Sequence, residues 1–285
     1  MDLLLLAVIA VIALALLFDF SNGFHDAANS VATAVATRAM TPRVAVAFSA
    51  FFNFLAYFFV GTAVANTVSK VVESDYASVA VVFAALVGAI SWNYLTWWIG
   101  MPSSSSHALI GGLVGAGLAA GWIDAISWGK VEEATIAIFA SPLVAFMIAF
   151  LAMYLVALLQ RVTGWADNAR PFKWLQVVSA GAVSFGHGAN DAQKTMGVIA
   201  ALLAGAGYTS VGSSGDIPVP EWVALTAYTA IALGTLWGGW KIIETMGLRI
   251  TTLHASSGVA ANIGAVTSIF GATSIDESRQ ENFKV

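Results

Sequence analysis

Charge is what this sequence has least of. Asp, Glu, Lys and Arg make up 10% of its 285 residues, whereas 59% of the residues are hydrophobic. A soluble globular domain carries about 25% charged residues, so this chain lacks the polar surface that would keep it in water. Cysteine is absent as well, which excludes a disulfide framework and thiolate chemistry. The composition therefore predicts a protein whose solvent is lipid.

Long uncharged segments support this prediction. Most of them approach the roughly 20 residues that a helix needs to cross the hydrocarbon core of a bilayer. The six segments are Leu3–Phe18, Val44–Val60, Ser78–Ile99, Ala108–Ala120, Ala134–Leu159 and Trp222–Trp240. A cleaved signal peptide would explain only the first of them. We predict an all-α polytopic protein of the cell membrane, plasma or inner, in contact with the lipid bilayer and not with nucleic acid.

The loops between these segments alternate in charge. Residues 38–43, 161–173 and 241–249 carry an excess of Arg and Lys, whereas residues 67–77, 124–133 and 207–221 carry an excess of Asp and Glu. Basic loops tend to stay in the cytoplasm. The first three loops are therefore expected inside and the other three outside.

Two polar segments interrupt the apolar pattern and are related to each other. Residues 19–30 read DFSNGFHDAANS and residues 184–195 read SFGHGANDAQKT. Shifted by 165 positions, Phe20 aligns with Phe185, Gly23 with Gly188, His25 with Asn190, Asp26 with Asp191 and Ser30 with Thr195. The loop assignment makes the first segment run inward and the second outward. This predicts inverted-topology repeats with discontinuous helices, in which residues 1–160 form one half and residues 161–285 the other.

The aligned aspartates suggest a cation site. A carboxylate at membrane depth costs at least about 2.5–3.5 kcal/mol and normally has a partner. The oxygen-bearing side chains beside the two carboxylates are Asn29, Ser30, Asn190 and Thr195. Hard oxygen ligands suit Na⁺, which predicts a sodium site at Asp26, Asn29, Ser30, Asn190 and Asp191. The alternative is that Asp26 and Asp191 are N-caps of following helices.

Three glycines and two histidines lie in the same segments. Gly23, Gly186 and Gly188 are expected to let the helices open, so that backbone carbonyls join the cation shell. His25 and His187 do not align under the shift, which disfavours a symmetric zinc centre. Each histidine is either a proton acceptor beside an aspartate or a hydrogen-bonded interior residue.

A third polar segment, Gly100–Ala108, contains a proline and four consecutive serines before His107. Proline blocks helix continuation, and a new helix is expected to start near His107. Free amides, the positive end of the helix dipole and hydroxyl donors together form an anion site, for which Ser104, Ser105, Ser106 and His107 are the candidates. The alternative is a serine-rich turn in water at the membrane face.

Two further features are left open by the sequence. Lys194 could face a bound oxyanion, pair with Asp191, or extend its ammonium group to the interface. Ser256 and Ser257, in a polar break ahead of another apolar segment, are weaker candidates for the oxyanion site.

These motifs resemble those of the inorganic phosphate transporter (PiT) family. Gly23–Ser30 and Gly188–Thr195 are similar to the Gly-x-Asn-Asp-x-Ala-Asn-Ser signature of each half, with His25 and Lys194 replacing an Asn. Pro102–Gly111 resembles the family's Pro-x-Ser-x-Thr-His segment, and Glu244–Gly247 with Ala255–Gly258 resembles a later motif. The resemblance spans residues 19 to about 270 and follows the order of the family motifs.

The resemblance implies a membrane symporter with inverted repeats and a re-entrant hairpin, which moves inorganic phosphate with Na⁺, or with H⁺ in some bacterial members. It implies that Asp26, Asn29, Asn190 and Asp191 lie near the cation, and that Ser104 to His107 lie near phosphate. Thr195 and Lys194 are added as phosphate ligands. A homodimer is the oligomeric state that it suggests, and neither enzymatic activity nor an organic cofactor is expected.

The sequence departs from the family pattern in two ways. Asn53 and Asn262 stand where the family often has Glu, which removes two proton carriers and favours Na⁺ over H⁺. Family members continue into another Pro-x-Ser-x-Thr-His hairpin, whereas this chain turns polar at Ser274 and ends at Val285. The second half is thus apparently shortened: either part of it lies outside the given sequence, or the second hairpin is missing.

The resulting hypothesis is sodium-coupled phosphate symport by alternating access. Na⁺ neutralises Asp26 and Asp191, phosphate then binds against the cation and the start of the helix near His107, and the repeats rock. A proton-coupled phosphate permease or a sulfate permease is the nearest alternative. An intramembrane hydrolase using Ser106 and His107 is a rival from another class, and a passive channel is a third.

Overall fold

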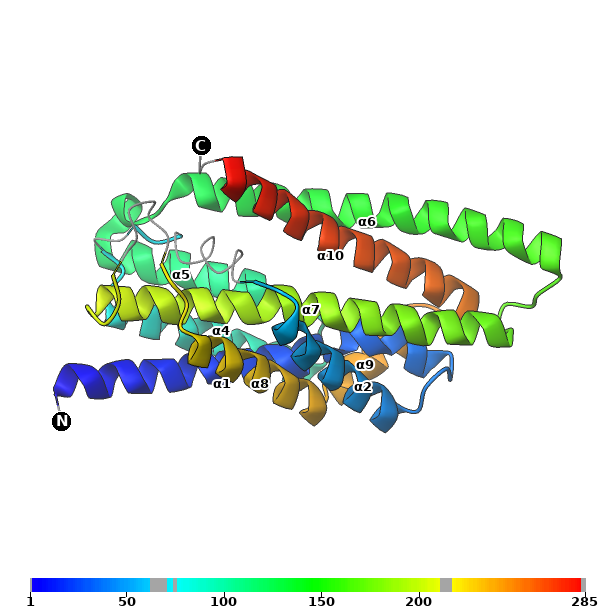
Figure 1. Cartoon of the computed structure of the whole chain (residues 1–285), viewed down its shortest axis with the longest axis horizontal. Coiled ribbons are helices and arrows are strands. Elements are labelled where there is room, and N and C mark those ends of the chain that lie inside the picture. Colours follow the sequence, from blue (N-terminus) through cyan, green and yellow to red (C-terminus); the bar gives the residue numbers. More distant parts are fainter. Residues whose placement is uncertain (1, 62–70, 74–75, 211–216, 283–285) are drawn as a thin grey trace.

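The protein is a bundle of helices that run mostly along one long axis (Figure 1). The computed structural model describes residues 2–61, 71–73, 76–210 and 217–282, with side chains described as far as residue 271. The main helices are α1 (Leu3–Ala36), α2 (Pro42–Leu55), α4 (Val79–Ile99), α5 (Ser105–Gly121), α6 (Trp128–Thr163), α7 (Arg170–Gly205), α8 (Glu221–Trp237), α9 (Trp240–Glu244) and α10 (Ala255–Asn282). Short 3₁₀ turns η1 (Ala56–Phe58) and η3 (Trp122–Ala125) and a π turn η4 (Thr245–Arg249) complete them. The predicted all-α fold is confirmed.

Several helices have the length and composition of membrane spans. Four described helical segments qualify: Leu3–Ala36, Val79–Ile99, Ser105–Ala125 and Trp128–Thr163. Helix α6 exposes large apolar side chains along its length, among them Phe139 at 76%, Phe146 at 64% and Leu155 at 56%. Such a surface is stable in lipid and not in water. The prediction of a polytopic membrane protein is therefore confirmed.

The loops gather at the two ends of the bundle as their charges predict. The basic loops at 38–43 and 161–173 lie toward the right in Figure 1, and residues 241–249, which form α9 and η4, lie in the same half beside α2, while the described parts of the acidic loops lie at the left end. Residues 67–70, 74–75 and 211–216 of those acidic loops are outside the described residues. The grouping therefore agrees with the sequence, and which end is cytoplasmic stays a prediction.

The two polar segments lie inside unbroken helices, so the expectation that their glycines open the helix is wrong. Helix α1 continues through residues 19–30, and α7 continues through residues 184–195 in the opposite direction (Figure 1). The alternative that Asp26 and Asp191 are N-caps is excluded by the same observation, because both occupy helix interiors.

The signature glycines serve close packing instead. A Cβ on Gly23 would lie 2.2 Å from the carbonyl oxygen of Ile231 in α8, and one on Gly188 would lie 2.4 Å from that of Asn53 in α2. Only a residue without a side chain allows backbones to approach so closely. Helix α1 therefore packs against α8, and α7 against α2, at matched positions. Asn53 Nδ2 of α2 donates to Thr235 Oγ1 of α8 at 2.7 Å, and this hydrogen bond joins the two helices.

Helix breaks occur at other places in the chain. Helix α4 ends at Gly100, which adopts the left-handed conformation (φ +72°), and Ser104 caps α5 by accepting from the His107 amide at 3.3 Å. Helices α4 and α5 enter and leave from the same end of the bundle (Figure 1), and Ser105 at the start of α5 is buried against Asn22 of α1. Such a pair fits the expected re-entrant hairpin, which stays a prediction. A second break, at Gly238 and Gly239, separates α8 from α9.

We predict that Gly188→Ala destabilises the protein while Gly115→Ala does not. The added methyl group at position 188 would overlap the Asn53 backbone, which can move only with α2, whereas a Cβ on Gly115 meets nothing within 4 Å. Overpacking of this kind costs roughly 1–3 kcal/mol. Thermal unfolding in detergent, followed by tryptophan fluorescence, should show a lower midpoint for Gly188→Ala alone. Equal midpoints would contradict the packing role.

Candidate functional site

Two buried aspartates face each other in the middle of the bundle. Asp26 of α1 is 6% exposed and Asp191 of α7 is 7% exposed. Together with His187 they offer three ligand atoms that lie within 4.8 Å of one another. Two unit negative charges at such a separation repel by about 3.5 kcal/mol at an effective dielectric constant of about 20. This cluster, named the aspartate centre below, is the part of the described structure best suited to bind a cation.

The Asp26 carboxylate is held by α1 and by the start of α5. Ser105 Oγ lies 2.5 Å from Asp26 Oδ2 and 2.6 Å from Asn22 Oδ1. A hydroxyl has one proton, so Ser105 donates to one of these oxygens at a time. His25 Nδ1 lies 3.1 Å from Asp26 Oδ1, while the Nε2 of the same ring lies 2.8 Å from Thr96 Oγ1 of α4. Thr96 thus fixes the plane of the His25 ring.

The Asp191 carboxylate has a charged partner. Lys194 Nζ, one turn later on α7, lies 2.5 Å from Asp191 Oδ1, and Asn22 Nδ2 donates to Asp191 Oδ2 at 3.3 Å. His187 Nε2 lies 3.3 Å from the same Oδ2 and 4.0 Å from Asp26 Oδ2. Lys194 offsets one of the two negative charges. With both histidines neutral, the centre keeps a net charge of −1.

Lys194 also connects the centre to the serine cluster. Its ammonium group donates to Ser106 Oγ at the start of α5 as well as to Asp191 Oδ1. Of the alternatives that the sequence left open for Lys194, the structure therefore shows the pairing with Asp191. Ser104 is the N-cap of α5, and His107 is exposed but close enough to Lys194, Asp26 and Asp191 to interact with them electrostatically. The serine segment is therefore not a turn in water, because Ser105 is fully buried.

The other predicted site residues are less close to the centre. Asn29 is exposed and makes none of the described contacts of the two carboxylates. Asn190 donates to the Gly186 carbonyl one turn earlier at 3.0 Å. Ser30 and Thr195 are buried, with hydroxyl oxygens that have no hydrogen-bond partner.

Ser256 and Ser257 belong to a different end of the molecule. Ser256 Oγ donates to Asp167 Oδ1 at 3.0 Å, and Ser257 Oγ accepts from the His254 amide at 3.1 Å. Ser256 therefore fixes the start of α10 to the loop after α6, whereas the Ser257 contact is local to the start of α10. Hydrogen bonds from Gln160 and Ser256 hold the pKa of Asp167 below its usual value. Neither serine contributes to the aspartate centre.

Sequence reasoning missed Asn22, and it left His187 with two alternatives, a proton acceptor beside an aspartate or a hydrogen-bonded interior residue. Asn22 bridges Asp191 and Ser105, and His187 lies between the two carboxylates. The shift of 165 positions aligns Asn22 with His187, so the internal repeat itself contained the signal. It was overlooked because His187 was compared with His25 and not with Asn22.

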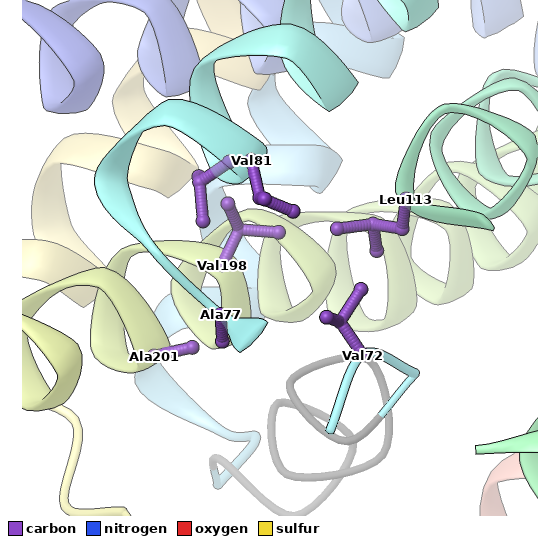
Figure 2. Close-up of a pocket in the computed structure, with 7 residues that line it drawn as sticks. Val72, Ala77, Val81, Leu113, Val198 and Ala201 are labelled. Atoms are coloured by element: carbon purple, nitrogen blue, oxygen red, sulfur yellow. The ribbon is translucent and has the colours of Figure 1, made fainter. Parts of the chain in front are cut away.

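A pocket elsewhere in the protein is not the site. It is lined by Val72, Ala77, Val81, Val82, Leu113, Val198 and Ala201, and Figure 2 shows their side chains facing one another between α4, α5 and α7. Each of these side chains is aliphatic. Such a lining offers neither donors for an oxyanion nor oxygens for a cation, so polar ligation belongs to the aspartate centre.

Comparison with known proteins identifies the family. The model of the phosphate transporter family matches residues 22–276, which include most of the first polar segment, all of the second and the serine turn. The chain belongs to this family. It is thus a phosphate transporter and not an enzyme, and it is a multi-pass protein expected in the plasma membrane.

Relatives in the phosphate transporter family are similar over most of the chain. A probable low-affinity inorganic phosphate transporter of Rhizobium meliloti is 50% identical over 93% of this chain and 78% of its own length. One of Bacillus subtilis with the same description is 42% identical over 96% of this chain and 82% of its own. A solved structure described as the sodium-dependent phosphate transporter matches with a TM-score of 0.83 at 25% identity, covering 95% of this chain and 85% of that one.

We predict that Ser105→Ala impairs phosphate binding far more than Ser103→Ala does. Ser105 contacts Asp26 and Asn22, whereas Ser103 Oγ accepts from Trp92 Nε1 at 2.9 Å and is not part of the centre. Removing a hydrogen bond to a charged group costs about 1.5–3 kcal/mol, or at least a tenfold loss of affinity. Equilibrium binding of labelled phosphate to both variants is the measurement. Equal losses would show that the serine turn acts only structurally.

Proposed function

We propose that this phosphate transporter is a sodium-coupled symporter, in which Na⁺ at the aspartate centre is required before phosphate binds beside Lys194 and the start of α5. One observation carries the proposal: two buried carboxylates lie close together with a single compensating ammonium group. A divalent or monovalent phosphate ion approaching this centre would meet net negative charge at low dielectric. A bound cation removes that repulsion, and this is the physical basis for coupling.

The ligands of the centre favour a hard monovalent cation. Besides the carboxylates of Asp26 and Asp191, the nearest groups are the Asn22 amide oxygen and the Ser105 hydroxyl. Such oxygens suit Na⁺. The solved structure with a similar fold is described as sodium-dependent, which supports the same coupling ion here. His187 would orient the carboxylates from α7 and, as a neutral ring, adds no charge.

The residues at positions 53 and 262 support Na⁺ over H⁺. Asn53 Nδ2 donates to Thr235 Oγ1, and Asn53 Oδ1 lies 3.3 Å from His187 Nδ1. Asn262 accepts from Thr33 at 3.1 Å and donates to Ser179 at 3.0 Å. These amides are structural hydrogen-bonding groups that cannot carry a proton, so the two positions offer no titrating acid.

Phosphate would bind where Lys194 meets α5. The ammonium group, the Ser106 hydroxyl and the free amides of the first helical turn are donors, and the positive end of the helix dipole points the same way. Ser104 is occupied as the cap of α5, and we therefore assign it an indirect role. His107 is exposed beside this group, where it could contact the anion on the open side.

An inverted repeat would allow the site to face each side of the membrane in turn. Helices α1 and α7 run in opposite directions, and α1 packs on α8 as α7 packs on α2, through glycines that correspond after the shift of 165 positions. These matched contacts support two halves at residues 1–160 and 161–285 that rock against each other. Alternating access by this route is part of the proposal.

We predict that purified chain in liposomes takes up labelled phosphate along an inward Na⁺ gradient, and that equal K⁺ does not replace Na⁺. Asp26→Asn and Asp191→Asn should each lose nearly all uptake, because the site then lacks the charge that retains the cation. Glu132→Gln, which removes an exposed carboxylate at the loop end of α6, should retain full uptake. Unchanged uptake in both aspartate variants would refute the cation site.

The sulfate and proton alternatives have their own test. Excess sulfate should fail to displace labelled phosphate, because HPO₄²⁻ can donate a hydrogen bond to Asp191 or Ser106 whereas sulfate cannot. Binding of phosphate in K⁺ at any proton concentration should remain weak. Strong competition by sulfate would favour a sulfate permease, and uptake driven by a proton gradient without Na⁺ would favour proton coupling.

A further inference from the structure

The end of helix α4 determines where the serine turn (residues 100–106) begins. The last carbonyl groups of a helix have no partner within it and need one from outside. Two amides of the turn donate to the Thr96 and Trp97 carbonyls at 2.9 Å and 3.1 Å. The next carbonyl, that of Trp98, accepts a hydrogen bond from Lys241 Nζ at 2.9 Å. A side chain 143 positions later in the sequence therefore completes the cap of α4.

The same ammonium group lies over an aromatic ring. Lys241 Nζ is 5.9 Å from the centroid of the Trp97 ring, which is within the range of a cation–π interaction. Trp97 in turn makes a T-shaped contact with Phe24 of α1, with ring centroids 5.4 Å apart. Glu244, the acidic residue one turn after Lys241, is paired with Arg249 at 2.7 Å. The charge of Lys241 is thus directed at the end of α4 and at a ring that rests on α1.

The segment that carries Lys241 is fixed to α1 by two glycines. A Cβ on Gly239, just before α9, would lie 2.1 Å from the carbonyl oxygen of Phe24. A Cβ on Gly247, in η4, would lie 3.1 Å from that of Ala32. These two contacts lie on either side of Asp26 in the sequence of α1, and such close approach of backbones leaves little room for movement. The segment is therefore a firm base on α1, from which the lysine reaches α4.

The start of the serine turn lies against this base. Gly100 is in the left-handed conformation, and a Cβ on it would lie 3.4 Å from Thr245 Oγ1 and 3.5 Å from Lys241 Cβ. Ser105 and Ser106 follow after a few residues and contact the aspartate centre. Because the connection is so short, a displacement of the end of α4 would also displace these two serines.

We propose that Lys241 is the positioning residue of the serine turn: by capping α4 it keeps Ser105 and Ser106 within reach of the aspartate centre. Lys241 acts through Trp97 and Trp98 and is not itself a phosphate ligand. The inference rests on the phosphate site proposed above at Lys194 and the start of α5. A turn that left this position part of the time would lower the apparent affinity for phosphate by the fraction of time it is away.

The contact also joins the two proposed halves of the molecule. Lys241 belongs to residues 161–285, whereas α4 and the serine turn belong to residues 1–160. The second half therefore supplies a hydrogen bond that the first half needs in order to present its serines. This role differs from that of Lys194, which contacts the serines directly.

Equilibrium binding of labelled phosphate to the purified full chain in Na⁺ is the first test. Lys241→Met keeps an apolar side chain of similar length but removes the ammonium group, and it should weaken binding about threefold to fivefold. Lys241→Arg keeps the charge and the donors, and it should restore binding to within about twofold of the wild type. Lys130→Met is the matched control, because Lys130 pairs with Glu133 within α6 at 2.9 Å, and it should bind as the wild type does.

The position of the turn can be measured separately from binding. The chain has no cysteine, so two introduced cysteines carry spin labels without background. Met101→Cys in the turn and Val178→Cys on α7 are suitable, since the native side chains are 40% and 67% exposed. Pulsed electron paramagnetic resonance should give one narrow distance distribution in this background and with Lys241→Arg. With Lys241→Met the distribution should broaden or gain a second maximum.

The two readouts separate this inference from the proposed phosphate site. A distance distribution that Lys241→Met leaves unchanged would overturn the positioning role, whatever happens to binding. Broadening together with weaker phosphate binding, both reversed by Lys241→Arg, would support it. Broadening with unchanged phosphate binding would leave the positioning role intact and contradict the phosphate site at the start of α5.

Discussion

The repulsion between buried carboxylates is the constraint on which this structure depends. Asp26 and Asp191 come from helices that pack directly on each other, and within the described part of the chain the Lys194 ammonium group alone offsets their charge. Every neighbouring polar group, from Ser105 of the hairpin to Asn22 and His187, is oriented by one of these two carboxylates. A bundle that removes such charges from water favours a cation beside them, which is the basis of the coupling proposed above.

The packing that creates the centre is made by glycine. Backbone contact at Gly23 and Gly188 brings α8 and α2 against the signature helices, and the Asn53–Thr235 hydrogen bond connects the two short helices. The polar segments thus stay helical because their glycines are used for contact between helices. The aspartates are held by rigid helices, which keeps the distance between them fixed when no ion is bound.

The helical class, the lipid environment and the identity of both aspartates could be predicted from the sequence. The low content of charged residues indicates the lipid environment, and the motif repeated after 165 positions identifies the aspartates; neither requires knowledge of the fold. It did not allow the course of the backbone through Gly23 to be predicted, since a glycine serves helix opening and close packing equally well. Asn29 was expected near the cation from its spacing, but its side chain is exposed. His187 was left without an assigned role because two of its neighbours, Asp26 and Asn53, belong to other helices, which spacing along one segment cannot identify.

The crosswise packing of α1 on α8 has a consequence for how the protein is made. Helix α1 is synthesised before α8, and the backbone that fits against Gly23 is at Ile231 and Thr235, more than 200 positions later. Until that segment is inserted, the Gly23 face of α1 lacks its final neighbour, whereas Ser105 of α5 can already reach Asp26. The packing of α1 is therefore completed only when the second half of the chain has been inserted.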